Sequence, residues 1–512
     1  MSFLPFIFFI VSALALLITF FSINPKKTAM ETVNDMGIGY NLGNSFESFN
    51  ISVKINNPDD QITLSGNEVP TKDLISNIKK YGFKTIRFPV TWMNFMDNNG
   101  NVNLDWMHRV KEVVNWIIKS NMYCILNVHH DGMTGQWLSE GIKSKDKFIY
   151  LWKQIANEFK NFNEHLIFES MNRVEYKIGE NYDFISLLTL TQAFVDTIRN
   201  SGGKNGDRLL IISGASKELD YTCSSEYKIP IDPSNKLAIS IAYDIPKQFA
   251  IEPDLNPWTY IYEDQVKEVP PMTIWGDEND YKEMFTSFEK MKEVFISKKI
   301  PIIIVEVNIL TEQKKDPDSI RKFLFSHFSM SSSYDGIMSC LWDTSNKKIG
   351  EMNHYDRKND KWYDEKTRDN IKNISKGKFI RPTDFFIVSN IETIKTPNHE
   401  GNMKIAIGNK KVLKVIFNVN LKTDNLYGAG FGIVTNNKYG NRAQEAISCA
   451  EGELKNDGSY SYTVDVSKLD YNDYVQIEKW WGHDYIFYNY LTIEFEQSYT
   501  FFDYYSYIKN LS

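Results

Sequence analysis

Short apolar runs alternate with longer amphipathic stretches from about residue 36 to 345. The apolar runs are MGIGYNLG (36–43), KTIRFPV (84–90), YCILNVHH (123–130), HLIFESM (165–171), RLLIISG (208–214), LAISIAY (237–243), IPIIIVEV (300–307) and DGIMSCLW (335–342). Between them, stretches such as 104–120 and 147–160 repeat apolar residues at three- and four-residue spacing, which predicts helices. Alternating strands and helices predict an α/β fold with a parallel sheet closed as a (β/α)8 barrel. An open, doubly wound sheet is the alternative, but it usually carries a glycine-rich phosphate turn, which this chain lacks.

The pattern changes after a linker at about 376–384. The runs FFIVSNIETIK, VLKVIFNVNL, YGAGFGIVTN, SYSYTVDVS and YNYLTIEFEQS are rich in β-formers and are separated by Asn, Asp and Gly. They predict an antiparallel β-sandwich. We therefore expect a barrel domain over 28–375 and an all-β sandwich-like module over 385–512.

Aromatic residues gather near the end of this module, at Trp480, Trp481, Tyr485 and Tyr488. Exposed aromatic rings can stack on the apolar faces of sugars, but strand alternation also places rings in a core. A carbohydrate-binding role for the module stays open at this point.

The chain begins with an uncharged apolar run at 3–23. About 20 such residues are enough to span a bilayer, so residues 1–27 are expected to be a signal peptide or a membrane anchor. No small-x-small cleavage site follows, which favours the anchor. Lys26 and Lys27 follow the run, and the positive-inside rule taken alone would then place the rest of the chain in the cytoplasm.

Composition narrows the classes of function. Hydrophobic residues make up 42% and aromatic residues 14% of the chain, which is typical of a globular protein. The net charge of -7 gives no basic surface for nucleic acid. The sequence also shows no spacing typical of metal ligands and no cofactor motif, so we expect no metal, no cofactor and no nucleic-acid partner.

Polar and aromatic residues mark the carboxyl ends of the predicted strands. They are Asn41, Arg87, His129, His130, Asp131, Asn172, Arg173, Tyr243, Glu306 and Trp342. Active sites of (β/α)8 barrels collect at this end of the barrel. Because buried polar groups are costly without partners, such a series predicts one functional site.

The same residues lie in motifs that resemble the cellulases of glycoside hydrolase family 5. The motifs are GYNLGNSFES (39–48), GFKTIRFPVTW (82–92), ILNVHHDG (125–132), CLWDTS (340–345) and HYDRKNDKWY (354–363). The resemblance spans about residues 34–365. It implies a TIM barrel that acts on or binds β-linked polysaccharide such as β-glucan.

The resemblance also implies roles for single residues. Glu306 matches the nucleophile, which forms a covalent glycosyl-enzyme intermediate, and Arg87 and Tyr243 match groups that keep it ionised and oriented. Asn172 matches the residue that binds the sugar 2-hydroxyl, and Trp342 matches the aromatic platform under the sugar. His129 matches a supporting imidazole, and His130 and Asn41 are expected to bind substrate with it.

Two positions depart from the family pattern. The family places its acid/base glutamate directly after the asparagine, where this chain has Arg173, and a histidine where this chain has Ala242. A guanidinium cannot deliver a proton, and loss of general acid catalysis typically costs about 10²–10⁴-fold in rate. Glu175, two residues further on, is a candidate relocated acid. By strand rise, Glu169 is expected to lie about 13 Å below the site.

Three hypotheses follow. The leading one is a family 5-like fold that binds glucan and has lost most or all hydrolysis, a pseudoenzyme. The second is an active endo-β-glucanase that uses Glu175 as its acid, and the third is a structural surface protein whose cleft binds nothing. Because a polysaccharide lies outside the cell, we expect an extracellular or cell-surface location.

Overall fold

The computed structural model describes residues 26–50, 55–178, 181–251, 274–276, 278–311, 315–345, 351–379, 386–387, 391–400, 402–406, 412–436, 442–467, 474–495 and 500–501. The apolar run at 3–23, predicted as a signal peptide or anchor, lies outside these residues. Within the described ranges, no helix is both long and apolar enough to cross a membrane. The chain divides into two compact units, Met1–Arg381 and Pro382–Ser512.

The first unit is a closed barrel of parallel strands. In order around the barrel, the described strands are β1 (Gly39–Asn41), β10 (Ile337–Leu341), β9 (Ile302–Val307), β8 (Leu237–Tyr243), β7 (Leu210–Ser213), β4 (Leu166–Glu169), β3 (Tyr123–Asn127) and β2 (Thr85–Phe88). Each strand lies within one of the apolar runs of the sequence. The predicted (β/α)8 barrel is confirmed, and the open-sheet alternative is wrong because β1 pairs with both β2 and β10.

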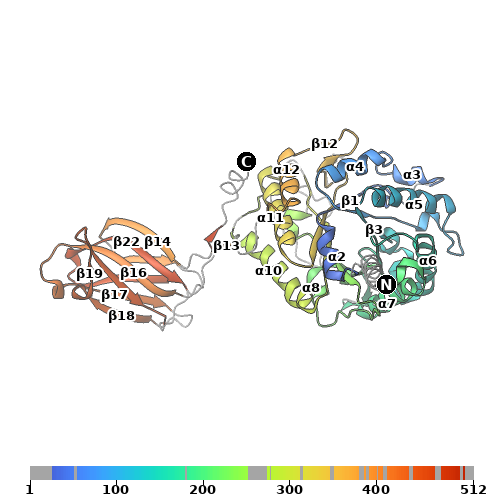
Figure 1. The fold of residues 1–512 in the computed structure, drawn as a ribbon. Helices are drawn as coiled ribbons and strands as arrows, with labels where there is room; N and C mark the ends of the chain where they lie inside the picture. Colours follow the sequence, from blue (N-terminus) through green and yellow to red (C-terminus); the bar gives the residue numbers. More distant parts are fainter. Residues whose placement is uncertain are drawn as a thin grey trace, which may run out of the picture. The chain divides into compact units, whose positions relative to one another are not determined.

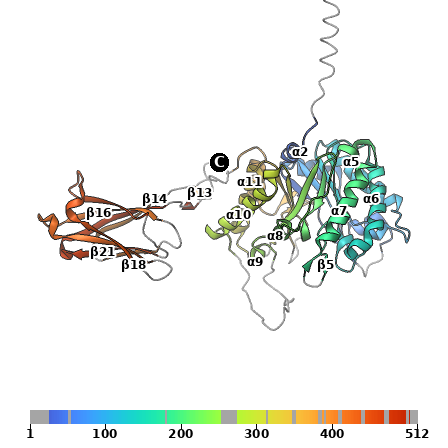
Figure 2. The same ribbon diagram turned by 90° about the horizontal axis from the view of Figure 1, so that it is seen from below.

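Helices surround the barrel, as Figures 1 and 2 show. They are α3 (Pro58–Ile62), α4 (Lys72–Lys80), α5 (Leu104–Lys119), α6 (Lys145–Phe159), α7 (Phe184–Arg199), α8 (Leu219–Thr222), α9 (Lys247–Ala250), α10 (Glu278–Val294), α11 (Pro317–Ser333) and α12 (Glu365–Ile374). Both helices predicted from apolar spacing, at 104–120 and 147–160, are confirmed as α5 and α6. Their buried residues recur at helical spacing and face the strands.

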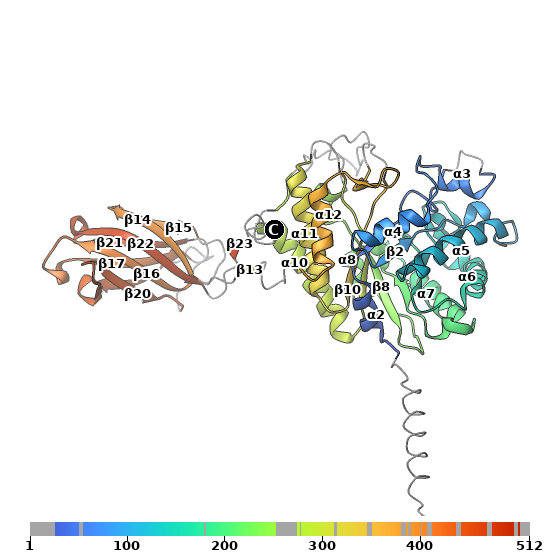
Figure 3. The ribbon, with the colours of Figure 1, turned by 45° about the horizontal axis from the view of Figure 1, so that its top comes forward.

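One further helix, α2 (Ala29–Met36), closes the amino end of the barrel (Figure 3). It begins with a capping box formed by Thr28 and Glu31. Ala29, Val33 and Met36 pack in one cluster with the inward-facing side chains of the strands. The amino end is therefore filled with apolar side chains, and the polar strand ends described below lie at the opposite end.

The second unit is a two-sheet β-sandwich. One sheet contains β14 (Ile391–His399), β22 (Ile486–Phe495), β16 (Val412–Leu421), β20 (Tyr460–Asp465) and β19 (Glu453–Leu454). The other contains β15 (Met403–Ala406), β21 (Tyr474–Trp481), β17 (Gly430–Asn436) and β18 (Arg442–Ser448). All neighbouring strands are antiparallel, as the alternation in the sequence predicted.

Short two-stranded pairs complete the described strands of both units. In the first unit, β5 (Lys177–Ile178) pairs with β6 (Asn181–Tyr182), and β11 (Tyr355–Asp356) pairs with β12 (Lys361–Trp362). In the second unit, β13 (Phe386–Ile387) pairs with β23 (Thr500–Phe501).

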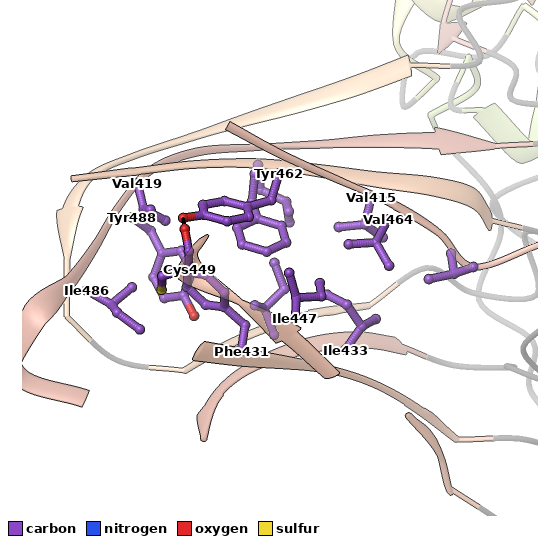
Figure 4. Close-up of a cluster of buried hydrophobic side chains, with 14 of the residues drawn as sticks. Val415, Val419, Phe431, Ile433, Ile447, Cys449, Tyr462, Val464, Ile486 and Tyr488 are labelled. Atoms are coloured by element: carbon purple, nitrogen blue, oxygen red, sulfur yellow. Dashed lines mark hydrogen bonds between the residues drawn. The ribbon is translucent and has the colours of Figure 1, made fainter. Parts of the chain in front are cut away.

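The core of the sandwich fills the space between its two sheets (Figure 4). Phe417, Phe431 and Tyr462 stack or meet edge to face there, with ring centroids 4.8–5.2 Å apart. Tyr488 is fully buried in the same cluster. Of the four aromatic residues near the end of the module, Tyr488 therefore belongs to the core and not to an exposed strip.

Candidate active site

Glu306 stands at the carboxyl end of β9, and a β-bulge sets its direction. Ile241 of β8 pairs with Ile304, but the next residue, Ala242, pairs with Glu306. The extra residue Val305 stays in the apolar barrel core. Bulges of this kind re-aim the following side chain. Glu306 consequently reaches the polar end of the barrel, with 12% of its side chain exposed.

Arg87 of β2 joins the polar groups at this end. Its Nη1 donates to Glu306 Oε1 at 2.8 Å and to Asn41 Oδ1 at 3.0 Å. Its Nη2 donates to Asn172 Oδ1 at 2.9 Å, and its Nε donates to Glu169 Oε2 at 2.7 Å. Burial alone would lower the pKa of Arg87, but the two carboxylates raise it above its usual value. Arg87 thus contacts the nucleophile candidate, as the resemblance implies.

Glu169 lies in the same network, so its expected remoteness from the site is wrong. Its side chain is fully buried and pairs with Arg87, whose guanidinium also binds Glu306. Strand rise measures distance along a strand, whereas the long arginine side chain bridges two strands across the barrel. Burial tends to raise the pKa of Glu169, but Arg87 and Lys217 lower it to about 2. Glu169 is therefore a fixed anion and cannot serve as a proton donor.

Lys217 completes this network and was missed in the sequence. It is fully buried, donates to Glu169 Oε1, and donates to Asn172 Oδ1 at 2.9 Å. It follows β7 in a short 3-10 turn where both Ser216 and Lys217 have positive φ. This left-handed backbone is unusual for non-glycine residues and returns the side chain into the barrel. Burial lowers the pKa of Lys217 to about 8, although Glu169 opposes the shift.

Three side chains form hydrogen bonds with Asn172. Its Oδ1 accepts from Arg87 and from Lys217, and its Nδ2 donates to His129 Nε2 at 3.0 Å. The other ring nitrogen of His129 faces Asn127 Nδ2 at 3.2 Å. Burial and the neighbouring positive charges hold the pKa of His129 well below its usual value. A neutral His129 therefore orients Asn172 as a supporting group, and one amide hydrogen of Asn172 is left for a ligand.

Trp342 lies at the mouth of the barrel. It is partly exposed, and its ring stacks on His129 with centroids 5.8 Å apart and planes 12° apart. Beside it, His130 is partly exposed and its Nδ1 donates to the Glu47 carbonyl at 2.7 Å. Trp342 and His130 thus both present partly exposed rings beside His129.

Asn41 departs from its expected role in substrate binding. It is fully buried, and its Nδ2 donates to the carbonyls of Val305 and Leu341 at 2.7 and 3.2 Å. Its Oδ1 accepts from Arg87. Asn41 therefore positions Arg87 from inside the barrel and cannot touch a substrate.

Tyr243 also departs from its expected role beside Glu306. Its ring packs against Phe288 of α10 and against Phe323 and His327 of α11, outside the barrel. Successive residues of a strand face opposite sides. Because Ala242 turns inward toward Glu306, Tyr243 must turn outward. The residue on β8 that does reach the site is the next inward-facing one, Asp244.

Arg173 and Asp244 form an ion pair at the mouth. Arg173 Nη2 lies 3.3 Å from Asp244 Oδ2, with 30% and 7% of the two side chains exposed. Burial would lower the pKa of Arg173, but Glu306 and Asp244 raise it, so the guanidinium stays charged. Burial tends to raise the pKa of Glu306, but Arg87, Lys217 and Arg173 together lower it. Glu306 is therefore ionised, and a permanent cation is its neighbour.

Glu175, the candidate relocated acid, is an exposed residue. Its negative charge is one of the factors that raise the pKa of Tyr182 in β6, so Glu175 lies near that strand.

Asp131 is buried, accepts from Trp92 N and Trp137 Nε1 at 2.9 Å each, and has its pKa raised by burial to about 6. Its bonds fix the loop after β3.

Two residues of the site were not singled out in the sequence, Lys217 and Asp244. The period-2 pattern of β8 contained a signal for Asp244, because Ala238, Ser240 and Ala242 are small inward residues and Asp244 continues their series. Lys217 gave no such signal, because its direction depends on the backbone of a turn. Within the described residues, no group of His, Cys, Asp and Glu could hold a metal ion.

Chemically, the site combines the ionised carboxylate of Glu306 with the stacked aromatic ring of Trp342 and the oriented amide of Asn172. The cations Arg87, Lys217 and Arg173 face the anions Glu169, Glu306 and Asp244. Such a site can bind a neutral polyhydroxylated ligand and offer Glu306 as a nucleophile.

Comparison with known proteins agrees with this chemistry. The family described as "Cellulase (glycosyl hydrolase family 5)" matches residues 43–348. Endoglucanase B of Ruminococcus albus is 32% identical over 350 residues, which are 66% of this chain and 78% of that protein. Endoglucanase A of Paenibacillus barcinonensis is 32% identical over 313 residues, 56% of this chain and 75% of that protein.

Solved structures similar to the barrel belong to the same family. A GH5-4 broad specificity endoglucanase from an uncultured bovine rumen ciliate is 61% identical, with a TM-score of 0.67 over 69% of this chain and 99% of that chain. A family 5 lichenase from Caldicellulosiruptor sp. F32 is 28% identical, with a TM-score of 0.62 over 69% of this chain and 96% of that chain. This chain therefore belongs to glycosyl hydrolase family 5, the cellulase family.

Proposed function

We propose that this protein binds β-linked glucan at the mouth of its barrel and has lost most or all of the hydrolytic activity of its family. The observation that carries the proposal is Arg173. It directly follows Asn172, where the family resemblance expects the acid/base glutamate, and its charge acts on Glu306. No proton can come from a guanidinium at any pH at which the protein is folded.

Binding is supported by the residues that remain in place. Trp342 offers a ring to the apolar face of a sugar, and Asn172 offers an amide hydrogen to a hydroxyl. The relatives are named endoglucanases and a lichenase, and a mutant of that lichenase is solved in complex with cellotetraose. Cellotetraose is accordingly the first ligand to test.

Loss of hydrolysis is supported by the chemistry that a retaining glycosidase needs. Two carboxyl groups must lie roughly 5–5.5 Å apart, one ionised and one protonated. Glu306 meets the first requirement because its pKa is lowered. Arg173 removes the second, and by lowering the pKa of Glu306 it also makes that carboxylate a weaker nucleophile.

The ion pair with Asp244 stabilises the charged side chain of Arg173 in the site. The two side chains neutralise one another at the mouth, which limits the cost of placing a guanidinium in a site with other cations. If Glu replaced Arg173, it would lie beside Asp244, and two neighbouring carboxyl groups raise the pKa of one of them. That is the state a general acid requires.

A second candidate function is an active endo-β-glucanase, favoured by the names of the relatives. It needs another proton donor, and Glu175 is the candidate closest in sequence to Arg173. Replacement of Glu175 by Gln would abolish glucan hydrolysis in that case. Full activity in this variant would exclude Glu175 as the acid.

The deciding experiment is sugar release from barley β-glucan and carboxymethyl cellulose by the wild type, Arg173→Glu and the double variant Arg173→Glu/Glu306→Gln. We expect activity from Arg173→Glu alone. Titration of the wild type with cellotetraose tests binding separately. Hydrolysis by the wild type that disappears in Glu306→Gln would contradict the loss of activity.

We further propose that the protein acts outside the cell or at its surface. The support is the apolar run at 3–23 and the location of polysaccharides outside cells. Fractionation of the host tests this proposal. A shortened soluble chain in the medium would mean a cleaved signal peptide, a detergent-extracted full-length chain would mean an anchor, and recovery from the cytosol would contradict the proposal.

A further inference from the structure

Two consecutive tryptophans share the outer face of the second sheet of the sandwich. Gly430 of β17 pairs with Trp481 of β21, but the next residue, Phe431, pairs with Lys479. Trp480 is therefore the extra residue of a β-bulge. In a regular strand, neighbouring side chains point to opposite faces, and a bulge removes that alternation. Phe431 faces the core (Figure 4). The rings of Trp480 and Trp481 lie against Gly432 and Gly430, the neighbours of Phe431 on its strand, and so both turn away from the core.

The two indole rings lie directly on the sheet because glycine stands beneath each. A Cβ atom at Gly432 would come within 1.9–2.4 Å of three atoms of the Trp480 indole. A Cβ atom at Gly430 would come within 2.0–2.5 Å of three atoms of the Trp481 ring. Contact with several atoms at once means that each ring covers its glycine with a face. Both tryptophans are partly exposed.

Both rings are fixed in place by hydrogen bonds. Trp480 Nε1 donates to Glu478 Oε2 at 3.2 Å, and Gln476 Nε2 donates to Glu478 Oε1 at 2.6 Å. Trp481 Nε1 donates to the carbonyl of Tyr427 at 3.3 Å. A ring that is already fixed loses little conformational freedom when it binds a ligand.

More aromatic surface lies at the same end of the sheet. The side chain of Tyr427 is 82% exposed and that of Tyr485 is 47% exposed. Tyr485 is connected to the end of β21 through the hydrogen bond from its backbone nitrogen to the Gly482 carbonyl, at 3.1 Å. The apolar core of the sandwich contains neither tryptophan and neither of these tyrosines. The rings are therefore not needed to fill the core.

We propose that Trp480 and Trp481 form a second, non-catalytic binding site, which takes chains of β-linked glucose. The faces of an indole carry negative charge and its edge positive charge. The faces of a β-linked glucopyranose present C–H groups with partial positive charge, because the hydroxyls project around the ring edge. The charges of the two surfaces are complementary, and Glu478 and Gln476 supply polar groups for the hydroxyls at the rim.

The choice of glucan as the ligand rests on the function proposed for the barrel, whereas the site itself rests on the sandwich alone. The test therefore measures the two sites separately with the full-length chain. Adsorption to insoluble amorphous cellulose reports the sandwich site, and calorimetric titration with cellotetraose reports the barrel. The variants are Trp480→Ala/Trp481→Ala, Trp342→Ala in the barrel, and the matched control Trp116→Ala at a partly exposed tryptophan of α5.

We expect the sandwich double variant to adsorb at least ten-fold more weakly to cellulose and to bind cellotetraose as the wild type does. Trp342→Ala should show the reverse pattern, and Trp116→Ala should match the wild type in both assays. Adsorption without cellotetraose binding in the wild type would contradict the barrel proposal and leave the sandwich site supported.

Unchanged adsorption of a folded double variant would overturn the sandwich site, and so would a wild type that does not adsorb. Equal loss in Trp116→Ala would overturn it as well, because adsorption would then be non-specific. If the double alanine variant does not fold, adsorption of the Trp480→Tyr/Trp481→Tyr variant to cellulose tests the sandwich site in its place. Tyrosine retains an aromatic face, so this variant should retain part of the adsorption, whereas complete retention in Trp480→Gln/Trp481→Gln would contradict the proposal.

Discussion

Lys217 donates to Asn172 Oδ1 at 2.9 Å from inside the barrel, and both residues are buried. The lysine thereby fixes the amide that the site turns toward a ligand. It also neutralises Glu169 together with Arg87. Lys217 thus contributes both to the neutralisation of Glu169 and to the orientation of the Asn172 amide.

Replacement of Lys217 by Met should therefore lower stability and weaken glucan binding together. Removal of one partner from a buried ion pair typically costs roughly 3–5 kcal/mol. Urea unfolding at pH 7 measures the first effect, and titration with cellotetraose measures the second. Lys143→Met, at an exposed lysine, is the control and should change the free energy of unfolding by less than about 0.5 kcal/mol. Wild-type stability of Lys217→Met would contradict this account.

Arg173→Glu should raise the rate of β-glucan hydrolysis by about 10²–10⁴-fold, the usual contribution of a general acid. The gain should disappear when Glu306 is also replaced by Gln. Initial rates on barley β-glucan measure it. A folded Arg173→Glu variant that stays as slow as the wild type would mean that position 173 is not the proton-donor position.

Asp244 should set the pH optimum of that restored activity. A neighbouring carboxylate raises the pKa of the new glutamate, so Arg173→Glu/Asp244→Asn should lose activity at a lower pH than Arg173→Glu alone. The pH profile of kcat/KM for the two variants provides the measurement. Profiles with the same basic limb would show that Asp244 does not interact with residue 173.

Tyr243→Phe should leave glucan binding unchanged, although the family resemblance implies a role for Tyr243 beside Glu306. The ring packs between α10 and α11, and phenylalanine preserves those contacts. The Kd for cellotetraose should stay within about two-fold of the wild-type value, well below the ten-fold that 1.4 kcal/mol represents. A ten-fold weaker Kd would indicate that the tyrosine does reach the site.

His327 should make the protein less stable in mild acid. Burial lowers its pKa to about 3, so the folded state stays unprotonated where the unfolded chain takes up a proton, below about pH 6.5. Stability is then complete above pH 6.5 and falls as the pH drops toward 3, by up to about 1.4 kcal/mol per pH unit.

Urea unfolding of the wild type and His327→Phe at pH 7, 6 and 5 tests this expectation. The difference in the free energy of unfolding between the two proteins should shift by about 2 kcal/mol in favour of the variant between pH 7 and pH 5. A constant difference would show that His327 does not contribute to the pH dependence.

The sequence by itself determined the elements of the barrel and most of its polar strand ends. Apolar runs separated by amphipathic stretches can bury both faces of a strand only in a parallel sheet covered by helices, so the eight strands of the barrel were predictable. Because all parallel strands end at the same rim, Arg87, His129, Asn172, Glu306 and Trp342 were predictable as neighbours.

Only the tertiary structure decided which of these side chains meet. Strand rise alone predicts that Glu169 is remote from the site, but Arg87 connects it to Glu306 across the barrel. The inward turn of Lys217 depends on two positive φ angles, which no residue pattern in this loop signals. The bulge at Trp480 depends on pairing with β17, which lies far away in the sequence. Alternation and periodicity are local and can be read from the sequence, whereas bulges, turn directions and bridging side chains depend on partners that only the folded chain brings together.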